Sequence, residues 1–390
     1  MRVVLTTDTY WPRINGVTVS VDTFQREFWK KGVEAYVFAP EYHNKIEEHE
    51  HIIRLAAFTL FISPEDRLAL PFLKKAFYRK MDLIQPDVVH VQTEFTTYLL
   101  AKDYCKKRGI PIVMTCHTYF EQYINHYMPY LPRKWARLFA RTVTRGVYNN
   151  ADRIICPTTL MRDVLVDYGV KKPIEIIPTG IAPEDFEGVS KEKEKKSSFL
   201  FSLFPNIKGK KVLLFTGRIG QEKNVSFLLD VVKLLKTDFP EIMLLLAGDG
   251  PFMEGLKKLV RKYNLTENVI QLGYIDRKLI KYVYALADVF TFPSKTETQG
   301  LVTTEAMLCG TPVVAIDRMG NSEVMKGEKG GFLVEDSVED FTSKVKLLLT
   351  DEKLYKKKSE EALKYAGSWP VAGVEADRIL ELYRDVIRKH

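Results

Sequence analysis

Short apolar runs alternate with helix-like segments along this chain, and the alternation occurs twice. The strand-like runs of the first series are MRVVLTT, AYVFAP, DVVHVQ, PIVMTCH and RIICPT, and those of the second are KVLLFTG, MLLLAGDG, VIQLG, VFTFPS and PVVAID. Between the first two runs, residues 17–31 carry apolar side chains at helical spacing, and Gly32 ends the pattern. This alternation predicts parallel sheets that are covered by helices on both faces.

A segment with little periodicity separates the two series. It contains Pro, Gly and a cluster of charges, which is typical of a linker. A chain of 390 residues is also long enough to bury two cores. We therefore predict an α/β fold with two doubly wound domains that face each other across a cleft. The predicted boundaries are 1–178 for the first domain, 179–200 for the linker and 201–370 for the second domain, with a closing helix at 371–390 that packs back on the first domain.

Cysteine usage and hydropathy favour a cytoplasmic location. The four cysteines are scattered and form no C-x-x-C pair, so neither a zinc site nor a disulfide framework is expected. The first residues lack the long apolar region of a secretory signal. No run approaches the roughly 18 apolar residues that span a bilayer.

The positive charge of the chain is concentrated in one region. The net charge is +8, and residues 101–150 contain nine Lys or Arg against two acidic residues. Such a region favours an anionic surface, either phospholipid or nucleic acid. A solvated helical face would explain the same charges. No nucleic-acid recognition motif accompanies the charge, so nucleic acid is not expected as a partner.

Ligands of doubly wound sheets bind at the carboxyl ends of the strands, so the loops that leave strands are the candidate sites. In the first domain, Gly16 stands at an expected helix start, where backbone amides could receive a phosphate. His117 directly follows an apolar strand. The alternatives are a simple turn at Gly16 and a hydrogen-bonded rim residue at His117.

The second domain has cations and glycines at its strand ends. Arg218 and Lys223 flank a glycine-containing turn and could neutralise a diphosphate, or be ordinary surface cations. No D-x-D pair occurs in the chain, so a metal-bound diphosphate is not expected and no metal or other cofactor is predicted. The strand exits at Gly248, Asp249 and Gly250 and at Tyr274 and Ile275 would let a flat ring approach the backbone.

Residues 296–307 read TETQGLVTTEAM and place two carboxylates around a helix start. Glu297 precedes the helix and Glu305 lies within it, while the amides from Thr298 and Gln299 through Gly300, Leu301 and Val302 lie between them. Vicinal hydroxyls are good partners for carboxylates, and a diphosphate suits the amides. A capped helix with one solvated and one structural Glu is the alternative.

The ordered motifs resemble one enzyme family across essentially the whole chain. E-x7-E stands ahead of A-M-x-x-G-x-P-V-V-A and follows G-R-x-x-x-E-K-N and G-D-G-P. This set resembles the retaining glycosyltransferases of family 4, which have two Rossmann-like domains in the GT-B architecture. The sequence differs from the family pattern at Asn15, because many relatives carry a second glycine beside the position of Gly16.

The resemblance implies a nucleotide-sugar-dependent hexosyltransferase with defined roles for these residues. Glu297 would hold the hydroxyls of the donor sugar and Glu305 those of the ribose. Arg218 and Lys223 would stabilise the leaving diphosphate with help from Gly16 and the amides of Gly300 to Val302, and Thr298 and Gln299 would also contact the donor. His117 would lie beside the donor sugar, and residues 248–250 and 274–275 would line the base. Retention without a well-placed nucleophile would leave charge stabilisation and positioning as the sources of catalysis.

The acceptor is suggested by T-E-T-Q-G-L together with HTYFEQYINHY, which resemble the diacylglycerol glucosyltransferase subgroup. The resemblance implies transfer of glucose from UDP-glucose to 1,2-diacylglycerol by a peripheral protein at the inner face of the cell membrane. Phosphatidylinositol, a cell-wall precursor and a soluble sugar stay open as acceptors, and a nucleotide-sugar epimerase is a more distant alternative.

The basic region supports a membrane surface independently of the resemblance. Residues 132–148 form a basic amphipathic pattern, and residues 72–84 form a second one. In the first, Trp135 lies on the apolar face, and Arg137, Arg141 and Arg145 recur at a spacing of four. The alternative is that these apolar faces pack on the sheet.

Overall fold

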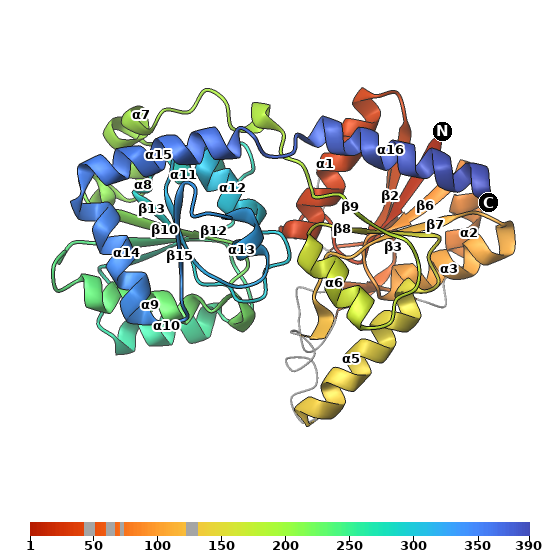
Figure 1. The fold of residues 1–390 in the computed structure, drawn as a ribbon, viewed down its shortest axis with the longest axis horizontal. Coiled ribbons are helices and arrows are strands. Elements are labelled where there is room, and N and C mark those ends of the chain that lie inside the picture. Colours follow the sequence, from red (N-terminus) through yellow and green to blue (C-terminus); the bar gives the residue numbers. More distant parts are fainter. Residues whose placement is uncertain (43–50, 60–66, 71–73, 122–131) are drawn as a thin grey trace. The chain divides into compact units, whose positions relative to one another are not determined.

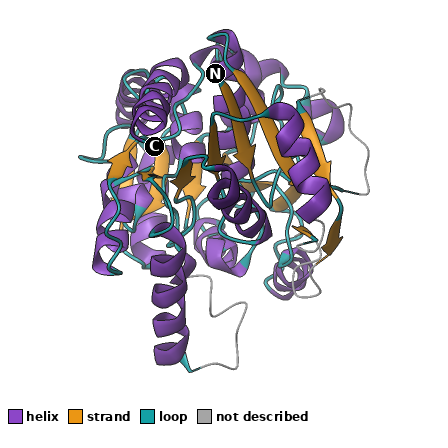
Figure 2. Cartoon of the chain, turned by 90° about the vertical axis from the view of Figure 1, so that its right-hand side faces the viewer, coloured by secondary structure: helices purple, strands orange, loops and turns teal. Residues whose placement is uncertain are grey.

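The computed structural model describes residues 1–42, 51–59, 67–70, 74–121 and 132–390. The chain forms two compact units, of which the first comprises residues 1–180 and 370–390 and the second residues 181–369. Each unit has its own parallel sheet with helices packed around it (Figures 1 and 2). Both units are therefore of the doubly wound α/β class, and the cleft between domains stays a prediction.

In the first unit, the sheet has the strand order β3-β2-β1-β6-β7-β8-β9, with every neighbouring pair parallel. The order reverses between β1 and β6, which makes their exits the topological switch point. A separate antiparallel pair, β4 and β5, lies outside this sheet. The strands are β1 Arg2–Thr6, β2 Glu34–Pro40, β3 Ile52–Leu55, β4 Ala57–Thr59, β5 Arg67–Ala69, β6 Val88–Val91, β7 Ile112–Thr115, β8 Arg153–Cys156 and β9 Ile174–Ile176, and the helices are α1 Gly16–Lys30, α2 Lys74–Ile84, α3 Thr96–Arg108, α5 Arg133–Tyr148, α6 Thr159–Asp167 and α16 Ala372–Lys389.

In the second unit, the sheet order is β12-β11-β10-β13-β14-β15, again parallel throughout. The switch point here lies between β10 and β13. The strands are β10 Val212–Thr216, β11 Met243–Ala247, β12 Val269–Gly273, β13 Val289–Phe292, β14 Val313–Ile316 and β15 Gly331–Val334, and the helices are η1 Pro183–Asp185, α7 Lys191–Ser197, α8 Leu200–Leu203, η2 Pro205–Ile207, η3 Gln221–Lys223, α9 Val225–Leu235, α10 Met253–Lys262, α11 Ile280–Leu286, α12 Leu301–Leu308, α13 Gly320–Val324, α14 Val338–Thr350 and α15 Glu352–Ala366.

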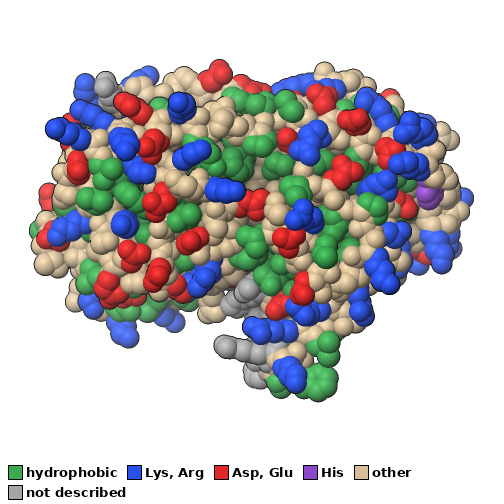
Figure 3. All heavy atoms as spheres, viewed as in Figure 1, with side chains coloured by type: hydrophobic (Ala, Val, Ile, Leu, Met, Phe, Trp, Pro, Cys, Tyr) green, Lys and Arg blue, Asp and Glu red, His purple; other side chains and the backbone are tan. Residues whose placement is uncertain are grey.

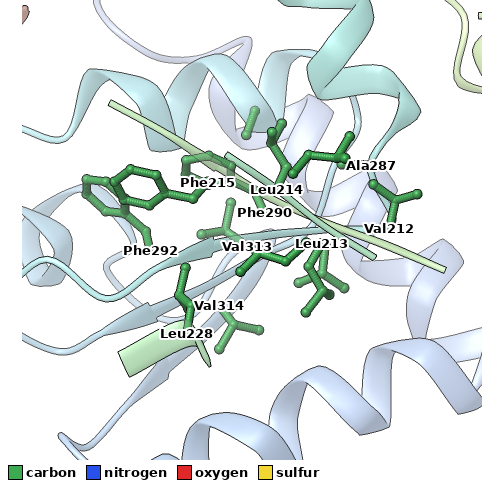
Figure 4. Packing of buried hydrophobic residues seen from close by; sticks show 14 of the residues in the cluster. Val212, Leu213, Leu214, Phe215, Leu228, Ala287, Phe290, Phe292, Val313 and Val314 are labelled. Carbon is green, nitrogen blue, oxygen red and sulfur yellow. The ribbon is translucent and has the colours of Figure 1, made fainter. Parts of the chain in front are cut away.

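Apolar strands explain why both faces of the second sheet are covered. Every residue of β10, β11, β13 and β14 is buried, as expected for a parallel sheet between two helical layers. Aromatic side chains fill its centre, where the ring of Phe292 lies 6.0 Å from that of Phe215 and 5.7 Å from that of Phe290 (Figure 4). This rigid core fixes the carboxyl ends of β10 and β13, from which the candidate site is built.

Helix α16 belongs to the first unit although it follows the second in sequence (Figure 1). Tyr383 on this helix is fully buried, packs its ring 5.8 Å from that of Phe28 in α1, and lies 2.5 Å from His90 Nδ1 of β6 through its hydroxyl. The other ring nitrogen of His90 lies 2.7 Å from Thr115 Oγ1, and burial lowers the pKa of His90 to about 3. The helix is therefore held to its sheet by a neutral, hydrogen-bonded imidazole.

The segment 179–200, predicted as a linker, is more ordered than expected. Helix α7 forms within it, and Lys191 Nζ donates to the carbonyl of Ala287 at 2.5 Å and to Thr311 Oγ1 at 3.0 Å. Lys195 pairs with Asp288 at 2.8 Å, and burial lowers the pKa of Lys191 to about 7. Part of the charge cluster therefore anchors this segment to the carboxyl end of α11 in the second unit.

Candidate functional site

Three glycine-containing loops stack at the carboxyl edge of the second sheet. A Cβ built at Gly248 would lie 1.9 Å from the carbonyl oxygen of Gly217, and one at Gly250 would lie 2.5 Å from that of Ile219. Ile219 N donates to Asp249 O at 2.9 Å, and Gly248 N donates to the carbonyl of Gly273 at 2.7 Å. Close contact with the neighbouring loop thus explains why glycine stands at positions 248 and 250. The sequence alone did not reveal this cause. Beyond them, Tyr274 is exposed, and Ile275 packs against the core.

The two predicted cations each bind a carboxylate. Arg218 Nη1 lies 2.6 Å from Glu222 Oε1, and Lys223 Nζ lies 2.6 Å from Glu297 Oε2. All four side chains are at least four-fifths buried, so both contacts are charge-assisted hydrogen bonds with little screening. Glu222, four residues after Arg218, was not selected from the sequence. Glu222 thus holds Arg218, and Glu297 holds Lys223, near the end of β10.

The loop that carries Glu297 is held by the start of α13. Gly320 N donates to the carbonyl of Glu297 at 2.7 Å, and a Cβ at Gly320 would lie 2.8 Å from Gln299 N. Gly300 adopts a positive φ of 76° as the residue before α12. Below it, the buried side chain of Asn321 donates to the carbonyls of Ser294 and Ile316. Thr298 and Gln299 are therefore positioned from both sides.

Helix α12 directs its amino terminus toward this edge of the sheet. The first amides of a helix have no acceptor within it, so those of Leu301 and Val302 carry the positive end of the helix dipole. This is where the sequence predicted a diphosphate to bind. Glu297 lies before these amides, and Glu305 lies one turn into the helix.

Glu305 is 4% exposed and is held by two side chains. Arg277 Nη1 lies 2.5 Å from Glu305 Oε1, and Tyr284 OH donates to Glu305 Oε2 at 2.8 Å. The hydroxyl of Tyr284 also lies 2.8 Å from Thr216 Oγ1 at the end of β10. Each carboxylate oxygen has a second lone pair, so a ligand hydroxyl can still donate to it. Neither Arg277 nor Tyr284 was selected from the sequence.

At the switch point of the first unit, Asn15 and Gly16 begin α1. Asn15 Oδ1 accepts from Thr18 N at 2.9 Å, and Asn15 Nδ2 donates to Thr9 Oγ1 at 2.8 Å. Asn15 is therefore the N-cap, which explains the departure from the two-glycine pattern. A Cβ built at Gly16 meets nothing within 4 Å. The fold itself does not require glycine at that position, which leaves space for a ligand to approach the backbone.

His117 lies at the end of β7 as a neutral imidazole. Its Nε2 is 2.8 Å from Gln92 Oε1, at the end of β6. Burial lowers the pKa of His117 to about 4, so the ring is uncharged at neutral pH. A neutral ring can exchange hydrogen bonds with a sugar hydroxyl, but it brings no positive charge to a phosphate.

A buried carboxylate that sequence analysis did not select joins two of these loops. Asp8, after β1, accepts from the hydroxyls of Thr93, Thr96 and Thr97 at 2.7 to 2.9 Å and from the amide of Thr97. Burial raises the pKa of Asp8, although these hydrogen bonds oppose the shift. The run of threonines in QTEFTT was the available signal.

Helix α5 projects from the first unit (Figures 1 and 2). Its first turns expose an apolar surface. Trp135, Leu138 and Phe139 are 62%, 54% and 45% exposed, and green and blue spheres mark this end of the helix in Figure 3. The alternative that this apolar face packs on the sheet is wrong for these residues, because the face toward the domain is formed by the small side chains of Ala136 and Ala140.

The arginines of α5 are partly neutralised. Arg137 and Arg141 both pair with Glu121, Arg141 also pairs with Asp167, and its guanidinium lies 4.8 Å from the ring centre of Tyr168. Arg145 is exposed on the next turn. The quoted motif HTYFEQYINHY lies largely outside the described residues, as do Phe72 and Leu73 of the second basic pattern.

In the part of the chain that the structure describes, no helix has the length and hydropathy to span a bilayer. The same residues contain no cluster of three or more His, Cys, Asp or Glu side chains that could hold a metal ion. The candidate site contains the cations Arg218 and Lys223, the first amides of α12, and the two ion-paired carboxylates Glu297 and Glu305.

Comparison with known proteins identifies the family. The model described as glycosyltransferase family 4 matches residues 14–185, and that described as glycosyl transferases group 1 matches residues 201–365. An alpha-monoglucosyldiacylglycerol synthase of Streptococcus pneumoniae is 32% identical over 81% of this chain and 71% of its own length. The chain belongs to the family 4 glycosyltransferases. An enzyme of the same name from Acholeplasma laidlawii is 29% identical over 85% of this chain and 84% of its own length.

Solved structures agree on the fold of this family 4 glycosyltransferase. Sucrose-phosphate synthase from Thermosynechococcus elongatus has a TM-score of 0.82 at 20% identity, with both chains covered completely. Anabaena HepE, solved with UDP and glucose, has a TM-score of 0.78 at 16% identity, with 97% of this chain and 98% of HepE covered. The two Rossmann-like units are those of the GT-B architecture, and the protein is a nucleotide-sugar-dependent transferase.

Proposed function

We propose that this family 4 glycosyltransferase moves glucose from UDP-glucose to 1,2-diacylglycerol, with retention at the anomeric carbon, at the inner face of the cell membrane. The observation that carries the proposal is the similarity to two monoglucosyldiacylglycerol synthases, which extends over 81% and 85% of this chain. The exposed apolar and basic surface of α5 supports a lipid acceptor independently.

For the donor, we assign the second unit to the nucleotide and the diphosphate. Arg218, Lys223 and the first amides of α12 would neutralise charge that develops on the leaving diphosphate, and no metal is needed for that. The loops at 248–250 and 274–275 would face the base, and Glu305 would accept from the ribose hydroxyls. Arg218 is held by Glu222, Lys223 is held by Glu297, and α13 holds the loop before α12, so little reorganisation would accompany the reaction.

Glu297 is assigned to the hydroxyls of the donor sugar. Its Oε2 already lies 2.6 Å from Lys223 Nζ, which makes it a poor nucleophile and a well-oriented hydrogen-bond acceptor. In the first unit, Gly16 would allow a phosphate to approach the start of α1, and neutral His117 would contact the sugar. Retention would then come from departure and attack on one face of the sugar, without a covalent glycosyl-enzyme.

The acceptor assignment places α5 on anionic lipid. Trp135, Leu138 and Phe139 would enter the interface, while Arg137, Arg141 and Arg145 would contact headgroups from the adjacent face. More distant relatives are named for other acceptors: one from Escherichia coli for a diphosphoundecaprenol-linked sugar and one from Mycobacterium tuberculosis for a phosphatidylinositol dimannoside. These acceptors are therefore competing outcomes of the test.

The test is product analysis by mass spectrometry and NMR. UDP-glucose, UDP-galactose and GDP-mannose are each offered with dioleoylglycerol, phosphatidylinositol, an undecaprenyl-diphosphate sugar or glucose, in vesicles that contain phosphatidylglycerol. We expect α-glucosyl-dioleoylglycerol from UDP-glucose. Glu297→Ala is expected to lower its formation at least about 100-fold, and exposed Glu335→Ala serves as the matched control. A β-linked product, another acceptor, or an isomerised nucleotide sugar formed without acceptor would refute the proposal.

A further inference from the structure

Glu94 is a carboxyl group at the switch point of the first unit that none of the assigned roles uses. It follows β6 in the loop whose neighbouring residues are already bound to candidate site groups. Gln92 holds His117, and Thr93 donates to Asp8. The Glu94 side chain is half-buried at the carboxyl edge of the sheet, where ligands of this fold bind.

The partner of Glu94 comes from the far end of α5. Tyr148, the last residue of that helix, is fully buried and donates its hydroxyl to Glu94 Oε1. Burial raises the pKa of Glu94 to about 7, and the hydrogen bond from Tyr148 opposes this shift only in part. Among the residues that the structure describes, the other charged or titratable groups that act on this pair are Asp8 after β1 and the thiol of Cys116 after β7.

None of these neighbours is a cation, so the described residues of the first unit leave the Glu94 carboxyl group without a positive partner. Half-buried carboxylates without a positive partner are costly and are uncommon outside functional sites. A pKa near the working pH is also what a group that takes up a proton during reaction requires.

Apolar side chains lie directly beside Glu94. Phe95, the next residue, is 43% exposed, and Leu99, one turn along α3, is 54% exposed. The ring of Phe95 lies 6.3 Å from that of Phe120, which packs against Ala136 and Ala140 of α5. A carboxyl group therefore borders an exposed apolar surface that is connected to the proposed membrane helix. This combination fits a molecule with a hydroxyl at one end and an acyl chain beside it.

We propose that Glu94 binds the hydroxyl of the lipid acceptor and takes its proton, that Tyr148 positions Glu94, and that Phe95 and Leu99 contact the acyl part. This inference rests on the proposed function. The acceptor oxygen forms a bond to the anomeric carbon, while the bond from that carbon to the diphosphate breaks and leaves its electron pair on the diphosphate. The hydroxyl proton passes to the Glu94 carboxylate and is released to water after the product leaves.

The experiment measures kcat/KM for dioleoylglycerol between pH 5 and 9 with the full chain and UDP-glucose. For the wild type, we expect kcat/KM to rise tenfold per pH unit below about pH 7, because only the ionised carboxylate accepts the proton. Glu94→Gln should lower the plateau by about 100-fold or more and remove the acid limb. Glu94→Asp should restore part of the rate. Glu175→Gln, an exposed control in the same unit, should change neither.

Tyr148→Phe separates positioning from folding. Because the Tyr148 hydroxyl lowers the pKa of Glu94, its loss should move the acid limb to higher pH, which a purely structural role would not do. Binding of UDP, measured by calorimetry, should stay within about twofold for all variants, because the donor groups of the second unit are untouched.

The outcomes separate the two proposals. A wild type that transfers no sugar to dioleoylglycerol overturns the proposed function and this step with it. If the wild type is active and Glu94→Gln has the same kcat/KM, the role of Glu94 alone is overturned. The same holds if Glu94→Gln keeps the acid limb of the pH profile. If Glu94→Gln loses UDP binding together with activity, Glu94→Asp and Tyr148→Phe decide the matter through the position of the acid limb.

Discussion

Replacing Glu94 with Gln should make the first unit more stable at alkaline pH. Gln has the same shape as Glu and can still accept from the Tyr148 hydroxyl, but it never ionises. The pKa of Glu94 is raised from 4.5 to about 7 in the folded chain. The protonated form is therefore favoured by folding: its stabilising contribution is complete below pH 4.5 and is lost as the pH rises through 7.

The size of the effect follows from linkage between protonation and folding. At pH 8, ionisation of Glu94 in the folded chain costs about 3 kcal/mol relative to a group with the ordinary pKa. At pH 5, where Glu94 is almost fully protonated in the folded chain, the corresponding cost to the free energy of unfolding is less than about 1 kcal/mol. These are upper estimates, because water reaches a half-buried carboxyl. The gain on substitution should therefore shrink by roughly 2 kcal/mol between pH 8 and pH 5.

Urea denaturation followed by tryptophan fluorescence measures this gain. Of the four tryptophans, Trp11, Trp29 and Trp135 lie in the first unit and only Trp369 in the second, so the signal reports chiefly the first unit. Wild type and Glu94→Gln are compared at pH 5, 6, 7 and 8, with Glu175→Gln as control. Equal stabilities at pH 8, or a difference that does not vary with pH, would refute the argument that Glu94 is held in an unfavourable ionised state.

Three further outcomes are expected. EDTA should leave glucosyl transfer unchanged, because cations and amides bind the diphosphate; strict metal dependence would contradict this. Trp135→Ser with Phe139→Ser should reduce co-sedimentation with phosphatidylglycerol vesicles several-fold while UDP binding persists, and unchanged sedimentation would remove α5 from the membrane surface. Gly248→Ala should weaken UDP binding by at least about tenfold, because its Cβ would lie 1.9 Å from the Gly217 carbonyl and must displace one of the two loops. Normal affinity in that variant would show that the loops separate without consequence.

Strand positions and the doubly wound class were predictable from the sequence because buried parallel strands are continuous apolar runs. MLLLAGDG and VFTFPS, for example, form β11 and β13 with every strand residue buried. The loops after such strands then had to carry the site, which drew attention to Lys223 and Glu297. Their separation of 74 positions hides the ion pair between them, because it depends on β10 and β13 being neighbours in the sheet.

The hydrogen-bond and ion-pair partners of the candidate residues were harder to predict from the sequence. Arg277 approaches Glu305 only through the packing of α11 and α12, and Asp8 meets its threonines across 85 to 89 positions. Hydrogen-bond partners at such separations leave no periodic trace in a single sequence. Likewise, the charges of residues 179–200 suggested a linker, whereas Lys191 Nζ donates hydrogen bonds to the carbonyls of Ala285 and Ala287 at the end of α11.

The route of the chain through the first unit has a consequence for its biosynthesis. The chain leaves this unit after Gly180 and re-enters it at Pro370, and a Cβ at Gly180 would lie 2.5 Å from Ala372, so exit and entry adjoin. During translation, the second unit can fold as soon as residue 369 emerges, whereas the first must wait for its final helix and Tyr383. A nascent chain therefore exposes the α1 face that α16 covers until residues 372–389 have been made, and a stop codon before Tyr383 would leave His90 and Phe28 without this partner.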